Sequence, residues 1–227
     1  MNERDKYLMS MVMSSLDRRS GGAVLIDADS TQFVRMNLIL LKCLLEEKRL
    51  GGILITVDRP HQYMVHLLRM HGVSIEGLVF IDAIGRFSAD RKEAPARVGY
   101  VDEPFHIDTL PDAIADMRSG DIPGMNTNEI GFVMIDNLAA LLPFNSYASV
   151  EAFISKFISI MNSRWNAIVP LVVDRERYGL LYETVMVHTR DEFSMRGPKV
   201  DICDTMENKG RRTISGTRYD GGAQHEQ

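Results

Sequence analysis

Five aspartates stand where five apolar segments end. Segments 23–26, 53–57, 78–81, 132–135 and 168–173 are rich in Val, Ile and Leu, and the residues that follow them are Asp27, Asp58, Asp82, Asp136 and Asp174. Carboxylates held close together attract Mg²⁺ or raise one another's pKa, and both effects are useful in catalysis. A single aspartate after a strand more often caps a helix or starts a turn. The group as a whole is therefore the first candidate site.

The elements that must position these aspartates follow from the same pattern. The apolar segments have the length and composition of strands that are covered on both faces. Helical spacing of apolar residues occurs between them, at about 31–49, 60–72, 110–118 and 148–164. Strands that alternate with helices predict a mostly parallel sheet with helices on both sides, which is a three-layer α/β/α fold. In such a sheet the aspartates share the carboxyl edge, where α/β proteins bind ligands.

The remaining segments complete the predicted organisation. Residues 3–17 have the spacing of a leading amphipathic helix, and 85–108 read as a polar surface loop with an extended stretch at 98–101. Pro170 cannot donate to a sheet ladder, so we expect the last strand to lie near an edge or to begin after the proline. We expect one domain over residues 1–208 and a disordered tail over 209–227, which is poor in apolar residues.

Composition excludes several classes of protein. The chain has 227 residues, with 26 Lys and Arg against 31 Asp and Glu, and a net charge of −5. General nucleic-acid binders cluster positive charge, so there is no strong nucleic-acid signal. No apolar stretch approaches the roughly 18 residues of a membrane span, and the two cysteines, Cys43 and Cys203, set no disulfide framework. The charged first residues do not resemble a signal peptide, so we expect a cytoplasmic protein.

Three stretches together resemble the core of RecA-superfamily ATPases, in the KaiC-like branch that is related to archaeal RadA. They are 53–60, 72–82 and 132–142, and the resemblance extends over about residues 20–175. The third stretch is the most specific, because Asp136 after its apolar strand matches the Walker B ligand of Mg²⁺. The resemblance implies a RecA-like fold, assembly through the sides of the domain, and a site for Mg²⁺ and ATP or ADP.

The nucleotide-binding loop departs from that family. A P-loop uses glycines, a Lys and a Ser or Thr to hold phosphates and Mg²⁺. The matching segment 27–37 has no glycine and no lysine, and its nearest substitutes are Ser30, Thr31 and Arg35. The family's catalytic Glu falls at Asp58, which is one carbon shorter. We interpret the chain as a non-catalytic KaiC-like regulatory or assembly protein, a pseudo-ATPase that acts through a protein partner or self-association.

Two alternatives stay open. A Mg²⁺-dependent nucleotide-binding switch or weak ATPase would keep Asp136 as its metal ligand. Segment 25–31 also resembles the Asp-x-Asp-x-Thr motif of haloacid-dehalogenase-like phosphatases, in which Asp27 would be the nucleophile and Asp29 the general acid. Thr56 would then bind the phosphate. Such an aspartyl-phosphate mechanism also needs Mg²⁺ to neutralise charge.

Overall fold

The computed structural model describes residues 3–16, 21–84, 97–100, 107–117, 129–189 and 191–194. The chain divides into two compact units, Met1–Arg196 and Gly197–Gln227, and every described residue belongs to the first. The predicted tail at 209–227 and most of the predicted loop at 85–108 lie outside the described residues.

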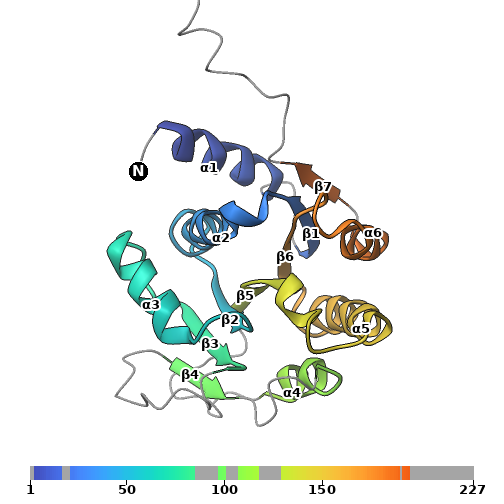
Figure 1. Cartoon of the computed structure of the whole chain (residues 1–227). Coiled ribbons are helices and arrows are strands. Elements are labelled where there is room, and N and C mark those ends of the chain that lie inside the picture. Colours follow the sequence, from blue (N-terminus) through green and yellow to red (C-terminus); the bar gives the residue numbers. More distant parts are fainter. Residues whose placement is uncertain are drawn as a thin grey trace, which may run out of the picture. The chain divides into compact units, whose positions relative to one another are not determined.

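A seven-stranded sheet forms the centre of the first unit (Figure 1). Its strand order is β4-β3-β2-β5-β6-β1-β7, and the neighbouring strands pair in parallel. The parallel sheet predicted from the sequence is thus confirmed. The strands are β1 Gly22–Asp27, β2 Gly51–Thr56, β3 Leu78–Asp82, β4 Arg97–Tyr100, β5 Ile130–Ile135, β6 Ile168–Val173 and β7 Asp191–Ser194.

Helices cover both faces of the sheet, which confirms the three-layer α/β/α fold. Figure 1 shows α1, α2 and α3 on one face of the sheet and α4, α5 and α6 on the other. One buried cluster of side chains joins each set of helices to the sheet. Short 3₁₀ turns at Ser30–Gln32 and Leu138–Leu141 lead toward α2 and α5, and a π-helical turn at Cys43–Glu47 ends α2. The helices are α1 Glu3–Leu16, α2 Phe33–Lys42, α3 His61–Met70, α4 Leu110–Asp116, α5 Tyr147–Trp165 and α6 Gly179–His188.

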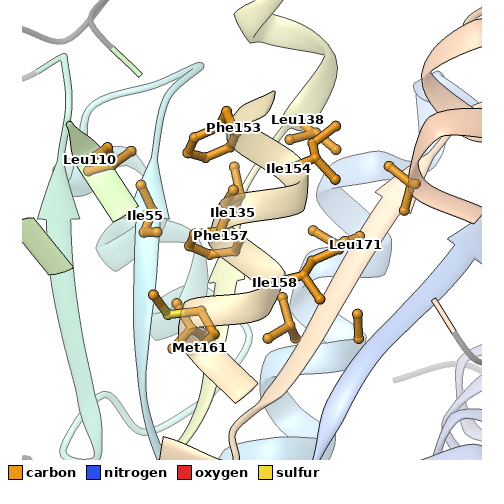
Figure 2. Close-up of a cluster of buried hydrophobic side chains, with 14 of the residues drawn as sticks. Ile55, Leu110, Ile135, Leu138, Phe153, Ile154, Phe157, Ile158, Met161 and Leu171 are labelled. Atoms are coloured by element: carbon orange, nitrogen blue, oxygen red, sulfur yellow. The ribbon is translucent and has the colours of Figure 1, made fainter. Parts of the chain in front are cut away.

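The core forms because the strands send alternate side chains to opposite faces. In β2, Ile53 and Ile55 join the cluster under α5, whereas Leu54 joins the cluster under α2 and α3. Figure 2 shows Phe153 and Phe157 of α5 packed toward Ile55 and Ile135 of the strands. Each fully buried side chain of this size contributes about 1.5–3 kcal/mol by leaving water. The two clusters hold the strands firmly, so the strand ends have fixed positions.

Pro170 lies in an interior strand, and the prediction of an edge strand was wrong. β6 is flanked by β5 and β1. The carbonyls of Ala167 and Val173 accept hydrogen bonds from N–H groups of the β1 segment, so by alternation the backbone at Pro170 faces β5. β5 pairs with β6 only at Phe132 and Ile168. The missing N–H therefore falls where no ladder bond is formed.

Helix α6 and strand β7 were not predicted from the sequence. Of the α6 residues, Leu181, Tyr182 and Val185 are buried and Leu180 and Val187 are exposed, so apolar residues occur around the whole helix. The spacing of 3.6 residues that identifies an amphipathic helix is therefore hidden. β7 has only four residues, which is too short for a clear strand pattern.

Candidate functional site

The carboxyl edge of the sheet gathers the five aspartates as predicted. Asp27 and Asp82 are the last residues of β1 and β3, and Asp136 and Asp174 follow β5 and β6 directly. These four side chains are buried, whereas the side chain of Asp58 is 43% exposed. Among the described residues, no three His, Cys, Asp or Glu side chains are grouped so that they could hold a metal ion. The five aspartates therefore share one edge of the sheet, but their carboxylates do not form a common metal site.

Two of these aspartates connect the loops that follow β1 and β6. Asp174 Oδ2 accepts a hydrogen bond from the backbone N–H of Ser30 at 2.8 Å. In return, Asp27 Oδ1 accepts from the backbone N–H of Arg175 at 3.2 Å. Hydrogen bonds of N–H groups to carboxylates are stronger than neutral ones. Each loop is thus held by the aspartate of the neighbouring strand.

Carboxylates of the chain also bind donor groups of Thr31, in the loop between β1 and α2, and of Arg35, in α2. Asp29 Oδ1 accepts from the backbone N–H of Thr31 at 2.8 Å and from the Thr31 hydroxyl at 2.6 Å, and so caps the short turn. Arg35, considered above as a substitute for the P-loop lysine, donates through Nη2 to Asp5 Oδ1 of α1 at 2.6 Å. In this loop, the groups that a phosphate would need are therefore bound to carboxylates of the chain itself.

A second polar site lies between the ends of β2 and β5. The chain leaves β2 toward α3 on one face and leaves β5 toward α5 on the other, and a crevice at such a point is where open α/β sheets bind ligands. Asp136 Oδ1 accepts from the backbone N–H of Val57 at 2.8 Å, and Asp136 Oδ2 from that of Asp58 at 3.4 Å. Asn137 Nδ2 donates to Asp58 Oδ2 at 3.3 Å. The two sequence candidates, Asp58 and Asp136, are thus neighbours.

The protonation of Asp136 is shifted by its surroundings. The pKa of Asp136 is raised from 3.8 to about 7, mainly by burial and in smaller part by the nearby carboxylate of Asp58, whereas the backbone N–H of Val57 opposes the shift. A substantial fraction of Asp136 is therefore protonated at neutral pH.

Three further polar residues lie near Asp136, and sequence reasoning missed two of them, Asn37 and Asn137, and considered Thr56 only as a phosphatase residue. Asn37 of α2 is buried and donates through Nδ2 to the backbone carbonyl of Asp136 at 2.6 Å. Among the described residues, Asn37 Oδ1, Thr56 Oγ1 and Asn137 Oδ1 are buried atoms that lack a hydrogen-bond partner. Such atoms are rare in folded proteins. The sequence signal that could have identified Asn37 is its position as a single Asn in the leucine-rich segment 36–45.

Asp82 has a separate role at the start of α3. Its Oδ2 atom lies 2.6 Å from Nδ1 of His61 and accepts the His61 backbone N–H at 2.9 Å, while Oδ1 accepts from Ile84. Both side chains are fully buried. The pair anchors the start of α3 to the end of β3. Asp82 therefore binds the helix and is not part of a shared carboxylate centre.

The arrangement does not fit the phosphatase alternative. Thr56 ends β2, and Asp27 ends β1, with β5 and β6 between them. Three strand spacings of about 4.8 Å separate the two residues, so they cannot contact one phosphate. Asp27 is also buried and holds the backbone of Arg175. A nucleophile needs an exposed oxygen in front of the phosphate.

Comparison with solved structures supports the fold. The chain is similar to uncharacterized protein PH0321 from Pyrococcus horikoshii in complex with an unknown peptide, with 15% identity, a TM-score of 0.57, and coverage of 81% of this chain and 83% of that one. It also matches the flagellar accessory protein FlaH from Methanocaldococcus jannaschii, with 14% identity, a TM-score of 0.49, and coverage of 79% and 76%. The first likeness confirms the RecA-like α/β/α fold.

Comparisons of the sequence itself gave no relative. No family model matches the chain, and no curated protein matches it. Among the described helices, none is long and apolar enough to cross a membrane. The comparisons therefore support the RecA-like fold of this chain.

Proposed function

We propose that the chain is a non-catalytic KaiC-like regulatory or assembly protein that has lost P-loop ATP hydrolysis and acts through protein contacts. One observation carries the proposal. The N–H groups of Ser30 and Thr31 are occupied by Asp174 and Asp29, and Arg35 is paired with Asp5. These are the donors that would bind phosphate in an active P-loop.

The energetics favour this interpretation. A bound phosphate would have to displace two carboxylate hydrogen bonds, each worth on the order of 1.5–3 kcal/mol. It would also lie beside Asp29 and Asp174, whose negative charges repel it. The loop has no glycine to let its backbone wrap around an anion. The combined cost is several kcal/mol, and about 1.4 kcal/mol weakens binding tenfold.

One further fact is consistent with action through protein contacts. PH0321, which has the same fold, was crystallised with an unknown peptide, which is a precedent for peptide binding by this fold. The proposed protein therefore uses its RecA-like domain as a scaffold for a partner.

Thermal unfolding with added ligands tests the loss of nucleotide binding. A ligand at about a hundred times its Kd stabilises the native state by about 2.7 kcal/mol, which raises the melting temperature by several degrees. We expect no shift with Mg²⁺ and ATP, ADP or a phosphate analogue. An active P-loop ATPase measured in the same buffers is the positive control.

Two results would overturn the proposal. Stoichiometric binding of Mg²⁺-ATP, with turnover that Asp136→Ala abolishes and Asp116→Ala leaves unchanged, would establish the nucleotide switch or weak ATPase. Hydrolysis of a phosphate monoester that requires Mg²⁺ and is abolished by Asp27→Asn would establish the phosphatase. Asp116 serves as the control because it is an exposed residue of α4, away from the carboxyl edge.

A further inference from the structure

Two buried polar side chains near the carboxyl edge each have an oxygen without a partner. Thr56 is fully buried at the end of β2, and Asn37 is 3% exposed, on the buried side of α2. Among the described residues, Thr56 Oγ1 and Asn37 Oδ1 form no hydrogen bond. A buried polar atom without a hydrogen bond is costly and rare in folded proteins. Each of these oxygens therefore needs a partner.

Thr56 lies beside Asp136 on one face of the sheet. Leu54, two residues before Thr56, belongs to the buried cluster under α2 and α3. Met134, two residues before Asp136, belongs to the same cluster. Because side chains alternate along a strand, Thr56 and Asp136 also point to the face that α2 and α3 cover. They are neighbours across β2 and β5, which are in register at the preceding residues, Ile55 and Ile135.

Asn37 reaches the same place from α2. Its Nδ2 atom donates to the backbone carbonyl of Asp136 at 2.6 Å. The Oδ1 atom of Asn37 is bonded to the same carbon as Nδ2, so it also stays beside Asp136. The unpartnered oxygens of Asn37 and Thr56 are therefore close together, but they do not bond to each other.

The carboxylates on either side of Thr56 are already used. Both oxygens of Asp136 accept backbone N–H groups of the loop that follows β2. Asp82, the ladder neighbour of Thr56 on β3, binds His61 and the backbone of the loop that follows β3. Neither carboxylate forms a hydrogen bond with the Thr56 hydroxyl. Within the described part of the chain, no side chain thus supplies the partner.

We propose that an internal water molecule bridges Oδ1 of Asn37 and Oγ1 of Thr56. Water suits both atoms, because it donates to the amide oxygen and either donates to the hydroxyl or accepts from it. At about 2.8 Å from each oxygen, one water spans a pair that is too far apart to bond directly. Internal waters normally have two to four polar partners. The inference does not depend on the proposed function.

A bound cation suits these atoms less well than water. Both oxygens are neutral, so they do not offset the cost of removing a cation from water. Among the described residues, no three His, Cys, Asp or Glu side chains are grouped to hold a metal ion. The proposed bridge therefore ties α2 to the end of β2 through a neutral molecule.

Oxygen-17 magnetic relaxation dispersion of the solvent tests the bridge, because it counts long-lived internal waters. Thr56→Val removes the hydroxyl and keeps the branched shape, so the count for the full chain should fall by one relative to wild type. Thr56→Ser keeps the hydroxyl and should leave the count unchanged. Thr184→Val is a matched control, since the Thr184 hydroxyl is bound to that of Tyr147, and it should also leave the count unchanged.

Urea midpoints supply a second test. Asn37→Leu and Thr56→Val should each lower the midpoint, and the double variant should lower it by less than the sum, because either single change leaves the water with one partner fewer. Melting temperatures should be equal in sodium, potassium and choline chloride of the same concentration. Circular dichroism spectra verify that every variant is folded.

Three results would overturn the proposal. They are equal water counts in wild type and Thr56→Val, strictly additive midpoints in the double variant, and stabilisation by one cation alone, which would assign the site to that ion. None of these results involves nucleotide, so failure here is distinct from failure of the ligand test above.

Discussion

Asp27 and Asp174 each accept the backbone N–H of the loop that follows the other's strand. The bonds run from Arg175 N to Asp27 and from Ser30 N to Asp174. Asp174 also accepts from the N–H groups of Glu176 and Arg177 through Oδ1. The pair extends the hydrogen bonding between β1 and β6 past the end of the sheet.

Removing Asp174 should destabilise the fold. Asp174→Ala leaves three backbone N–H groups without their acceptor, and the expected loss is about 1–3 kcal/mol in the free energy of unfolding. Urea denaturation measures it. Asp116→Ala, at an exposed position in the last turn of α4, should change stability by less than about 0.5 kcal/mol. Equal losses in the two variants would mean that the Asp174 bonds contribute nothing.

Asp136 should make stability depend on pH. Its pKa is about 7 in the folded protein against an ordinary value of 3.8, so the native state retains a proton that the unfolded chain releases. The contribution of this group is present below about pH 4 and is lost as pH rises through 7, by up to about 4 kcal/mol. Asp136→Asn cannot titrate. Urea midpoints measured from pH 4 to 8 should therefore fall less steeply in Asp136→Asn than in wild type.

The neighbouring carboxylate supplies a control for that experiment. Burial is the main cause of the raised pKa of Asp136, and the charge of Asp58 adds to it. Asp58→Asn removes that smaller contribution, so the loss of stability should occur at somewhat lower pH than in wild type. If wild type and Asp136→Asn give parallel pH curves, the pKa of Asp136 is not raised.

The ion pair between Arg35 and Asp5 should couple α1 to α2. Both side chains are mostly buried, with exposed fractions of 29% and 18%. A double-mutant cycle with Arg35→Ala and Asp5→Ala should give a coupling energy of about 1 kcal/mol. The same cycle on Lys6 and Glu3, which are 60% and 89% exposed, should give a value near zero. Equal coupling in the two cycles would contradict the role of burial.

Two glycines should respond in opposite ways to alanine. A Cβ at Gly52 would lie 2.4 Å from the ring of the buried Phe132, so Gly52→Ala should cost at least about 1–3 kcal/mol. A Cβ at Gly179, the first residue of α6, would meet nothing within 4 Å. Gly179→Ala should therefore stabilise by up to about 1 kcal/mol. Melting temperatures of the two variants measure the contrast.

The sequence predicted the five strands β1, β2, β3, β5 and β6 and the edge that the aspartates share, because buried parallel strands appear as uninterrupted apolar runs. It did not predict what the aspartates contact. Ser30 and Asp174 are 144 residues apart, and Arg35 and Asp5 are 30 apart, so these pairs arise only when the sheet and its helices have assembled. α6 escaped detection because its apolar residues lie on all sides.

The sheet is weakly paired between β5 and β6, on the side of β6 that Pro170 faces. β5 and β6 pair at one position, whereas β1 and β6 pair at six. The sheet therefore consists of two parts, β4-β3-β2-β5 and β6-β1-β7, which are joined mainly by side chains that pack on both faces. Each part keeps its own carboxylate bonds, at Asp136 in one and at Asp27 and Asp174 in the other. The junction between β5 and β6 has the fewest paired positions in the sheet, so backbone pairing resists sliding of the two parts least there.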